Sequence, residues 1–316
     1  MIKEEVKRMK ELTGFKLEWI LERLSIGRAT YYRWLKGKET PKIPFVHPLK
    51  VLKEEEDIVV RYAKLNPGIG YKKLTYQMID EDIVYLTPQQ VYGILTKYNL
   101  LNRWGNIKGR AEKEYKEKPT KVNEHWHTDI MYIKVSEIWG FLIAILDGYS
   151  RYIVGWKLLP DISSKSVSLF IQEILDKNRG VSPKIIHDNG SQFISKEFRE
   201  VISLAYLIDI RTRRNHPETN GKLERWNGLL RQEALRKDYP ATFTDAEQII
   251  AKYVDYYNNE RLHSSINYLR PVDYYRGNPE EILKEREDKI LKAKESRKIK
   301  NKEYNLKLKL SFGATD

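Results

Sequence analysis

Three strand-like runs follow one another between residues 125 and 159 with no helical segment between them, so the fold must contain a sheet. All three are rich in β-branched and aromatic residues and are separated by short turns, a pattern that predicts a three-stranded antiparallel meander. Helical and strand-like segments then alternate up to a helix that opens near residue 222. Strands first and alternation afterwards favour a mixed sheet covered by helices, an α+β (mixed α/β) fold. The predicted strands are HWHTDIMYIKV (125–135), WGFLIAILDGY (139–149), RYIVGWKLL (151–159), PKIIHD (183–188) and YLIDIRT (206–212).

The first hundred residues have a wholly helical pattern. In KLEWILERLSIGRATYYRWLKG (16–37), an apolar-periodic helix gives way at a glycine-containing turn to a second helix that begins near Arg28. This predicts a helix-turn-helix domain over residues 1–46, and a small helical hairpin with a solvated basic face fits the same pattern. Three more helices are predicted over 50–102, the last with Thr87 as N-cap and Pro88 at its first position. We expect a second helix-turn-helix domain there.

Two further segments are charged and poor in apolar residues. Residues 103–122 have the composition of a basic linker between the helical domains and the sheet domain at 123–276. Residues 277–316 predict a charged helical tail with a thin apolar stripe, followed by the strand-like YNLKLKLSF. A partly disordered basic tail is equally consistent with this composition.

Composition restricts the class of function. The chain of 316 residues contains no cysteine, which excludes disulfide bonds, thiolate catalysis and Cys-containing zinc sites. It shows no apolar run near the length of a membrane span and no signal-peptide pattern, so we expect a soluble, cytoplasmic protein and no membrane partner. The net charge is +13, and residues 1–120 hold 24 basic against 16 acidic residues. From charge alone, nucleic acid is the leading partner and an anionic membrane surface the second, and nothing in the motifs supports the membrane.

Three carboxylates stand out by position. Asp129 lies inside the first predicted strand, Asp188 ends the fourth, and Glu224 lies off the apolar stripe of the helix that opens at 222. Burying an unpaired carboxylate is costly or raises its pKa, whereas a divalent cation removes the penalty and prefers oxygen ligands. Each acid taken singly is more often structural. Their spacing is more informative, because 35 residues separate Asp188 from Glu224.

The sequence is also distinctive around and beyond these acids. The relevant segments are HTD, HDNGSQF and HPETNGKLERWNGLLRQE around the three acids, LDGYSRYIVGW (146–156) and YYNNERLHSSINYLRPVDYY (256–275). Together they resemble the DDE transposases of the retroviral-integrase-like superfamily, in which the last two acids are commonly 35 residues apart. The helical segments SIGRATYYRWL and GYKKLTYQMI resemble the end-binding helices of bacterial insertion-sequence transposases. The likeness extends over roughly residues 16–276.

This resemblance implies an RNase H-like integrase catalytic core over 123–276, with Asp129, Asp188 and Glu224 as catalytic residues and metal ligands. It implies two Mg²⁺ ions, for which Mn²⁺ can substitute, serving the attacking and the leaving oxygen of a phosphodiester. The implied activity is that of a DNA transposase that binds terminal inverted repeats, cleaves at the element ends and joins the 3′-hydroxyls to target DNA. The implied partners are double-stranded DNA and further copies of the chain, because two ends must meet in a dimer or larger assembly. The implied location is the nucleoid.

The expected DNA contacts are basic or polar residues on helices. A solvated basic face would give the same pattern, so these assignments depend on the resemblance. The eight residues are Arg28, Thr30 and Arg33 in the first helical domain, Lys72 and Lys73 in the second, and Lys222, Arg225 and Arg231 on the Glu224 helix.

The remaining polar residues of these motifs receive weaker assignments. The histidines lack the paired spacing of a zinc site. We keep His127 and His187 as candidates for positions near the metals and His216 as a candidate DNA contact. Asp147 is expected at a strand-turn junction, outside the triad. The pairs Asn189–Gly190 and Asn220–Gly221 are expected to shape the turns that present Asp188 and Glu224.

Two other functions fit much of the same pattern. The first is a DNA-binding regulator with an inactive integrase-like core, against which the intact set of three acids argues. The second is an RNase H-like nuclease without strand transfer. Two tandem helix-turn-helix candidates favour specific duplex ends over the hybrids that such a nuclease would cut.

Overall fold

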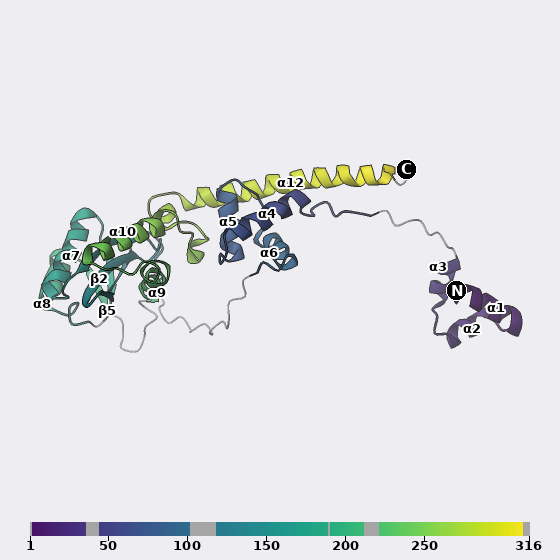
Figure 1. The fold of residues 1–316 in the computed structure, drawn as a ribbon, viewed down its shortest axis with the longest axis horizontal. Coiled ribbons are helices and arrows are strands. Elements are labelled where there is room, and N and C mark those ends of the chain that lie inside the picture. Colours follow the sequence, from purple (N-terminus) through teal and green to yellow (C-terminus); the bar gives the residue numbers. More distant parts are fainter. Residues whose placement is uncertain (1, 36–43, 102–117, 189, 212–220, 312–316) are drawn as a thin grey trace. The chain divides into compact units, whose positions relative to one another are not determined.

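The computed structural model describes residues 2–35, 44–101, 118–188, 190–211 and 221–311, with the elements labelled in Figure 1. Contacts divide the chain into two compact units. The first contains residues 1–50 and 296–316, and the second contains residues 51–295. Most of the predicted linker, together with Asn189, His216 and Asn220, lies outside the described residues.

The first unit begins with three short helices, α1 (Ile2–Thr13), α2 (Leu17–Arg23) and α3 (Arg28–Leu35). Their small core is formed by Val6, Ile20, Leu21 and Tyr31. The predicted pair of helices corresponds to α2 and α3. Helix α1 was not predicted, although Ile2, Val6 and Met9 recur at helical spacing; Val6 is buried in this core and Met9 packs against it.

The first unit also contains the end of α12 (Pro279–Ser311), against which two asparagines hold residues 46–50. The Asn305 side chain accepts the Val46 N–H at 2.9 Å and donates to the Val46 carbonyl at 2.7 Å. Asn301 Nδ2 donates to the carbonyls of Pro48 and Lys50 at 2.9 and 2.8 Å. Residues four apart lie on the same side of a helix, so the two amides bind one short segment, which turns at Pro48 and Leu49.

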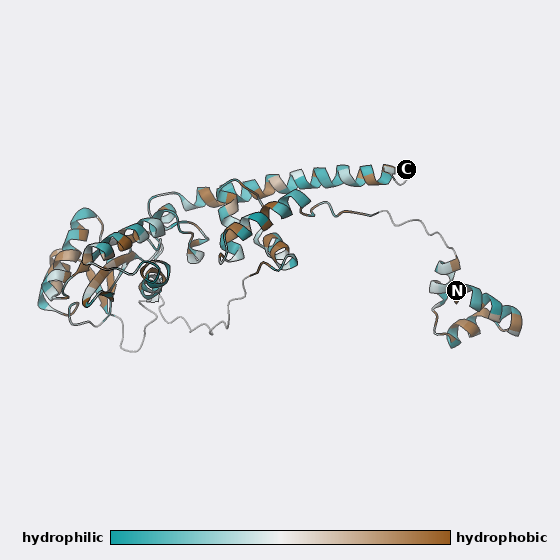
Figure 2. Cartoon of the chain, in the orientation of Figure 1, coloured by the Kyte–Doolittle hydropathy of each residue, from teal (hydrophilic) through white to brown (hydrophobic). Residues whose placement is uncertain are grey.

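The prediction that the tail ends in a strand-like segment is wrong, because α12 continues as a helix to Ser311. Residues 304–311 contain leucine and lysine, which favour helices, and no β-branched residue. An alternation of apolar and polar residues forms a strand only if a neighbouring strand is available to pair with it. In Figure 2, α12 is hydrophilic along most of its length, in agreement with its predicted charge.

The second unit starts with α4 (Lys53–Leu65), α5 (Tyr71–Asp80) and α6 (Pro88–Lys97). The predicted start of α6 is confirmed. The Gln90 N–H donates to Thr87 Oγ1 at 3.3 Å, the Thr87 N–H donates back to Gln90 Oε1 at 3.0 Å, and Pro88 occupies the first turn. The three helices share an apolar core of Val59, Leu74, Met78, Val84, Leu86, Val91, Ile94 and Leu95.

A five-stranded mixed sheet follows and confirms the predicted fold class. Its order is β3-β2-β1-β4-β5, with β1, β2 and β3 antiparallel to one another and β4 and β5 running parallel to β1. The strands are β1 (His125–Val135), β2 (Ile138–Asp147), β3 (Ile153–Leu159), β4 (Lys184–His187) and β5 (Ile208–Arg211).

Helices cover both faces of this sheet, and the period of two along β1 decides which residues face which layer. Trp126 joins a cluster with residues of α7 (Ser164–Lys177) and α8 (Lys196–Leu204). Met131, Ile133 and Val135 join the cluster of α9 (Gly221–Leu230) and α10 (Phe243–Asn259). Figure 2 shows the resulting concentration of hydrophobic residues on the strands. Asp129 is two residues before Met131 on the strand, so its side chain lies on the same face of the sheet, the one that α9 covers.

Shorter elements connect the core to the tail. A π-helical turn, η2 (Arg231–Leu235), follows α9, and the segment after α10 contains η3 (Ser264–Ile266) and α11 (Pro271–Tyr275) before α12. Within the described parts of the chain, we find no helix with the length and apolar character needed to cross a membrane.

Candidate active site

Asp129 lies in the middle of β1, on the face covered by α9. It is half-buried, and the residues before it, His127 and Thr128, are buried. Asn227 Nδ2, on α9, donates a hydrogen bond to Asp129 Oδ2 at 3.0 Å. This bond connects the first acid directly to the helix that carries Glu224.

Asp188 directly follows β4, the strand next to β1. His127 pairs with Ile186 in the parallel register, and continuing that register by two residues brings Asp188 beside Asp129. The Asp188 side chain is exposed, and its Oδ1 accepts the Gly190 N–H at 2.9 Å. A Cβ at position 190 would meet Asp188 Oδ1 at 3.0 Å, so glycine allows the turn to approach the carboxylate.

Glu224 lies in the first turn of α9 and is exposed. The predicted apolar stripe of this helix is confirmed, because Leu223, Trp226 and Leu230 are at most 1% exposed and pack in the cluster shared with β1 and α10. The stripe fixes the rotation of the helix about its own axis. Glu224 is therefore presented at the rim of the sheet.

The electrostatics of Asp129 indicate that the three acids lie near one another. Burial, followed by the negative charges of Asp188 and Glu224, raises the pKa of Asp129 to about 6. Hydrogen bonds from the Ile130 N–H and the Asn227 amide oppose this shift and lower the pKa. Burial also raises the pKa of Glu224. Like charges that share a site disfavour ionisation, and a cation would remove that penalty.

The three acids are nevertheless not arranged as a closed metal site. In the described part of the chain, no group of three or more His, Cys, Asp and Glu side chains is placed to hold a metal ion. Asp129, Asp188 and Glu224 supply the oxygen donors that Mg²⁺ prefers, so the chemistry of the donor set fits a hard divalent cation. In this conformation they influence one another without surrounding an ion-sized space.

Lys222 does not present its charge to solvent as expected for a DNA contact. Its Nζ donates to the Gly148 carbonyl at 3.0 Å, in the turn between β2 and β3. Burial, followed by the nearby Arg151 guanidinium, lowers its pKa to about 7. Lys222 thus anchors the start of α9 to this turn. Sequence spacing could not give this orientation, because it depends on a residue 74 positions away.

The other two basic residues of this region are exposed. Among the described residues, Arg225 has no ion-pair partner, and Arg231 makes one long contact, 3.5 Å from Nη2 to the Tyr132 carbonyl. Arg225 also acts on His263, whose pKa falls to about 3 through burial and then the charges of Arg151, Arg261 and Arg225. Several cations therefore gather beside the first turn of α9.

The DNA contacts expected in the helical domains also differ in their exposure to solvent. On α3, Arg33 is exposed, Thr30 is half-buried, and Arg28 is exposed with an ion pair to Glu18 at 3.0 Å. On α5, Lys72 is exposed. Lys73 is half-buried, and its pKa is lowered by burial and then by Arg261.

Asp147 lies outside the acidic group, as the sequence indicated. It is fully buried and accepts hydrogen bonds from the N–H groups of Asn123, Tyr149 and Ser150 and from the Ser150 hydroxyl. These donors give it a structural role in the turn after β2. His187 is also buried, and burial lowers its pKa.

Sequence comparisons match the segment that contains the three acids. Two families described as integrase core domain match residues 119–215 and 209–271. A transposase of insertion sequence IS904 from Lactococcus lactis is 29% identical over 163 residues, which are 51% of this chain and 64% of that protein. The putative transposase InsK of IS150 from Escherichia coli is 21% identical over 287 residues, covering 85% of this chain and 97% of that protein.

Residues 119–271 therefore match the integrase core domain, and the relatives that share this segment are insertion-sequence transposases. Solved integrases show weaker likenesses. An intasome of simian T-cell lymphotropic virus has a TM-score of 0.46 at 15% identity, over 70% of this chain and 74% of that chain. The catalytic core domain of HTLV-2 integrase in complex with magnesium has a TM-score of 0.40 at 21% identity, over 50% of this chain and 99% of that chain.

Sequence reasoning missed one residue of this integrase-core site, Asn227. It lies three positions after Glu224, so both residues occupy neighbouring positions on one side of α9. That spacing was the signal that could have identified it. The structure adds the hydrogen bond to Asp129, through which Asn227 favours the ionised carboxylate.

The raised pKa of Asp129 gives a pH prediction for the metal-free protein. The folded-state pKa is about 6, above the ordinary value of 3.8, so the folded state favours the protonated carboxyl. This contribution to stability is complete below pH 3.8 and is lost as the pH rises through about 6. The ¹³C carboxyl resonance of Asp129 should titrate near pH 6, and Asn227→Ala should move the midpoint higher. A wild-type midpoint near 4, as in an ordinary aspartate, would contradict this.

Proposed function

We propose that this chain is a DNA transposase that binds the terminal inverted repeats of its element, cleaves the phosphodiester at each end and joins the freed 3′-hydroxyls to target DNA. The observation that carries the proposal is that Asp129 lies within the electrostatic reach of both Asp188 and Glu224, three acids from separate elements of the sheet domain. No protein nucleophile is needed for such a reaction, because the attacking groups are water and a 3′-hydroxyl.

We propose that Asp129, Asp188 and Glu224 hold two Mg²⁺ ions, with Mn²⁺ as a substitute. When bound, these ions activate the attacking oxygen and stabilise the leaving oxygen. The chain's own residues prepare the ligands. The Asn227 amide orients one Asp129 oxygen and opposes the rise in the Asp129 pKa, and the Gly190 N–H donates to Asp188 Oδ1. A shift of α9 toward the sheet would bring Glu224 in, and DNA docking is the event that would drive it.

We assign the recognition of DNA ends to the helical domains, with Arg28, Thr30, Arg33 and Lys72 as the contacts. Arg225, on α9, and Arg231, just after it, are exposed. We propose that they contact the DNA backbone next to the phosphate that is cut. Lys222 faces the Gly148 carbonyl, so we give it the role of an anchor for α9. Joining two ends requires a dimer or larger assembly. A protein with this activity works on the bacterial nucleoid, in the cytoplasm.

The test is a reaction with a duplex that carries the element's end, read from the DNA flanking the coding region. With Mg²⁺, wild-type protein should nick the duplex at the end and then produce joined products with a target plasmid, while Asp188→Ala should do neither. Equal products from both proteins would remove the acids from the mechanism. Nicking without joined products would support the nuclease alternative, and end binding without nicking by wild type would support the regulator.

A further inference from the structure

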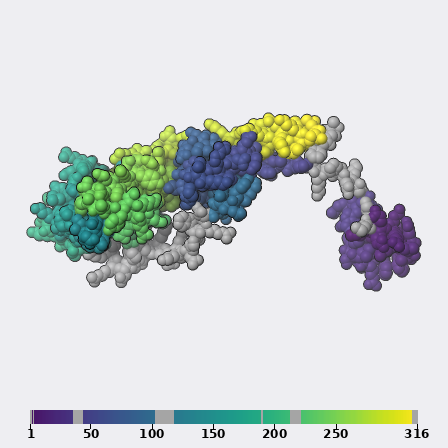
Figure 3. Space-filling model, viewed as in Figure 1, coloured from purple at the N-terminus to yellow at the C-terminus, as the bar shows by residue number. Residues whose placement is uncertain are grey.

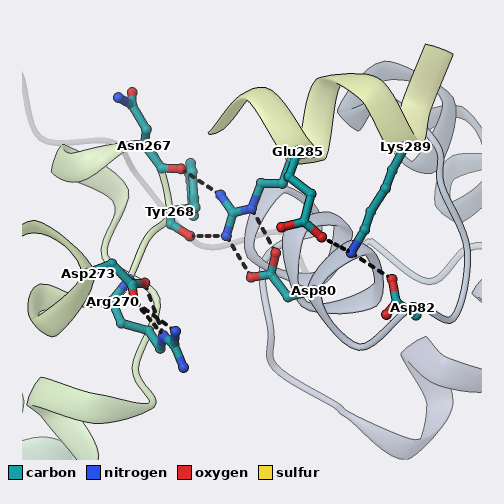
Figure 4. A network of polar contacts seen from close by, with 9 residues as sticks. Asp80, Asp82, Asn267, Tyr268, Arg270, Asp273, Glu285 and Lys289 are labelled. Atoms are coloured by element: carbon teal, nitrogen blue, oxygen red, sulfur yellow. Dashed lines mark hydrogen bonds and ion pairs between the residues drawn. The ribbon is translucent and has the colours of Figure 1, made fainter. Parts of the chain in front are cut away.

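One buried arginine on α12 connects three separate segments of the second unit. Arg286 is 4% exposed, and its guanidinium donates to the two carboxylate oxygens of Asp80, at the end of α5, at 2.7 and 2.6 Å. It also donates to the backbone carbonyls of Asn267 and Tyr268, at 3.1 and 2.9 Å. Figure 4 shows Asp80, Asn267 and Tyr268 around this guanidinium. The arginine thus binds the second helical domain and the turn that follows η3 at the same time.

The geometry around Arg286 is specific to a planar, forked cation. Its guanidinium lies 4.8 Å from the centre of the Tyr76 ring, and that ring stacks on Tyr268 at 5.2 Å. Asn267 and Tyr268 both have φ of 55°, a left-handed conformation that L residues seldom adopt. Two such residues in succession are held by their surroundings, and here they direct two carbonyls at one side chain. Lysine could not replace this set of bonds.

One further ion pair joins the end of α5 to α12, and the start of α5 lies near a second pair. Lys289 on α12 pairs with Asp82, just after α5, at 2.7 Å. At the other end of α5, Lys73 lies within the electrostatic reach of Arg261 and Glu233. Arg261 and Glu233 form a half-buried ion pair at 2.7 Å, and Glu233 belongs to η2, the turn that continues the Glu224 helix. The C-terminal end of α5 is therefore held by two ion pairs to α12, and Lys73, near its start, lies close to the pair formed by Arg261 and Glu233.

We propose that the first half of α12 locks the second helical domain onto the catalytic core, and that Arg286 is the residue that fixes their spacing. In Figure 3 the blue surface of residues 51–101 lies against the yellow-green start of α12. With the end of α5 fixed in this way, its exposed face and the three acids move as one body. The position of the cut relative to the bound DNA sequence is then set by this spacing. This last consequence rests on the proposed function, whereas the lock itself does not.

The absence of native cysteine allows the lock to be measured directly. Cysteines introduced at the exposed positions Lys64, on α4, and Lys252, on α10, provide two dye sites for single-molecule energy transfer. The parent protein should give one narrow distribution. Arg286→Gln should broaden it or add a second population, because the buried Asp80 contact and both carbonyl contacts are lost. Lys284→Gln, at an exposed position on the same helix, is the matched control and should leave the distribution narrow.

Two more variants separate a lost lock from lost folding. Asp80→Asn should broaden the distribution less than Arg286→Gln, and the double variant should add little to Arg286→Gln, because the two residues share one interaction. Circular dichroism checks that each variant is folded. A narrow, unchanged distribution in folded Arg286→Gln or, if that variant does not fold, in folded Asp80→Asn would overturn the proposal.

The cleavage pattern provides a readout that general destabilisation would not produce. Wild type should cut at one position, whereas Arg286→Gln should spread its cuts over neighbouring positions at a comparable total rate. If Arg286→Gln broadens the energy-transfer distribution but still cuts at the wild-type position, Arg286 is not the residue that positions the cut. If wild type does not cut at all, the proposed function fails, and the energy-transfer result still decides whether the lock exists.

Discussion

Replacement of Asp129 by asparagine should reduce Mg²⁺-dependent nicking of an end duplex by about a thousandfold or more, while affinity for that duplex stays within a few-fold of wild type. The amide keeps the size of the side chain and removes the charge that would bind a cation. Affinity should be retained, because we assign the phosphate and base contacts chiefly to the helical domains. Glu224→Gln should behave in the same way, although its carboxylate is exposed and comes from a helix.

The control for this experiment is Asp176→Asn, an exposed acid on α7 that is outside the candidate site. It should nick at the wild-type rate. Nicking by Asp129→Asn at the rate of this control would contradict the proposed role of Asp129. Loss of both nicking and binding would instead indicate that the substitution unfolds the core or that both functions share one surface.

The largest effect on stability is expected from Trp226→Ala, which should lower the free energy of unfolding by about 3–5 kcal/mol. Trp226 is 1% exposed, belongs to the cluster between the sheet, α9 and α10, and meets the Tyr257 ring edge to face at 6.3 Å. Its removal leaves a cavity directly beneath the helix that presents Glu224. Denaturant unfolding measures the change.

A matched tryptophan is available for comparison. Trp139 on β2 is 55% exposed, and Trp139→Ala should change the free energy of unfolding by only about 0.5 kcal/mol. Similar losses in both variants would mean that the apolar stripe of α9 is not what holds this helix on the sheet.

Local sequence patterns predicted the helices and strands of the core, because each of these segments contains the residues that favour its own secondary structure. The run at 125–135 is rich in β-branched and aromatic residues and became β1 with the same bounds, and the Thr87–Pro88 pair marked the start of α6. The acids were identified through their spacing and their family resemblance. Their convergence needed the sheet, because the parallel register of β1 and β4 is what brings Asp188 beside Asp129.

The features that the sequence did not predict depend on partners that are distant in the chain. Lys222 resembles any basic residue on a helix until the Gly148 carbonyl is seen beside it. Arg286 lies in a strongly charged helix and looks solvated, yet its partner Asp80 is 206 residues away and buries it. Asn227 contacts Asp129 across 98 residues. A pattern within one element cannot contain this information.

The most direct test is a crystal structure of the chain bound to an end duplex and Mn²⁺, with the metal located by its anomalous scattering. We expect metal peaks coordinated by carboxylate oxygens of Asp129 and Asp188, with α9 shifted so that Glu224 completes the ligand set. Peaks that touch none of these acids, or a Glu224 carboxylate still out of reach of every metal with DNA in place, would contradict the account.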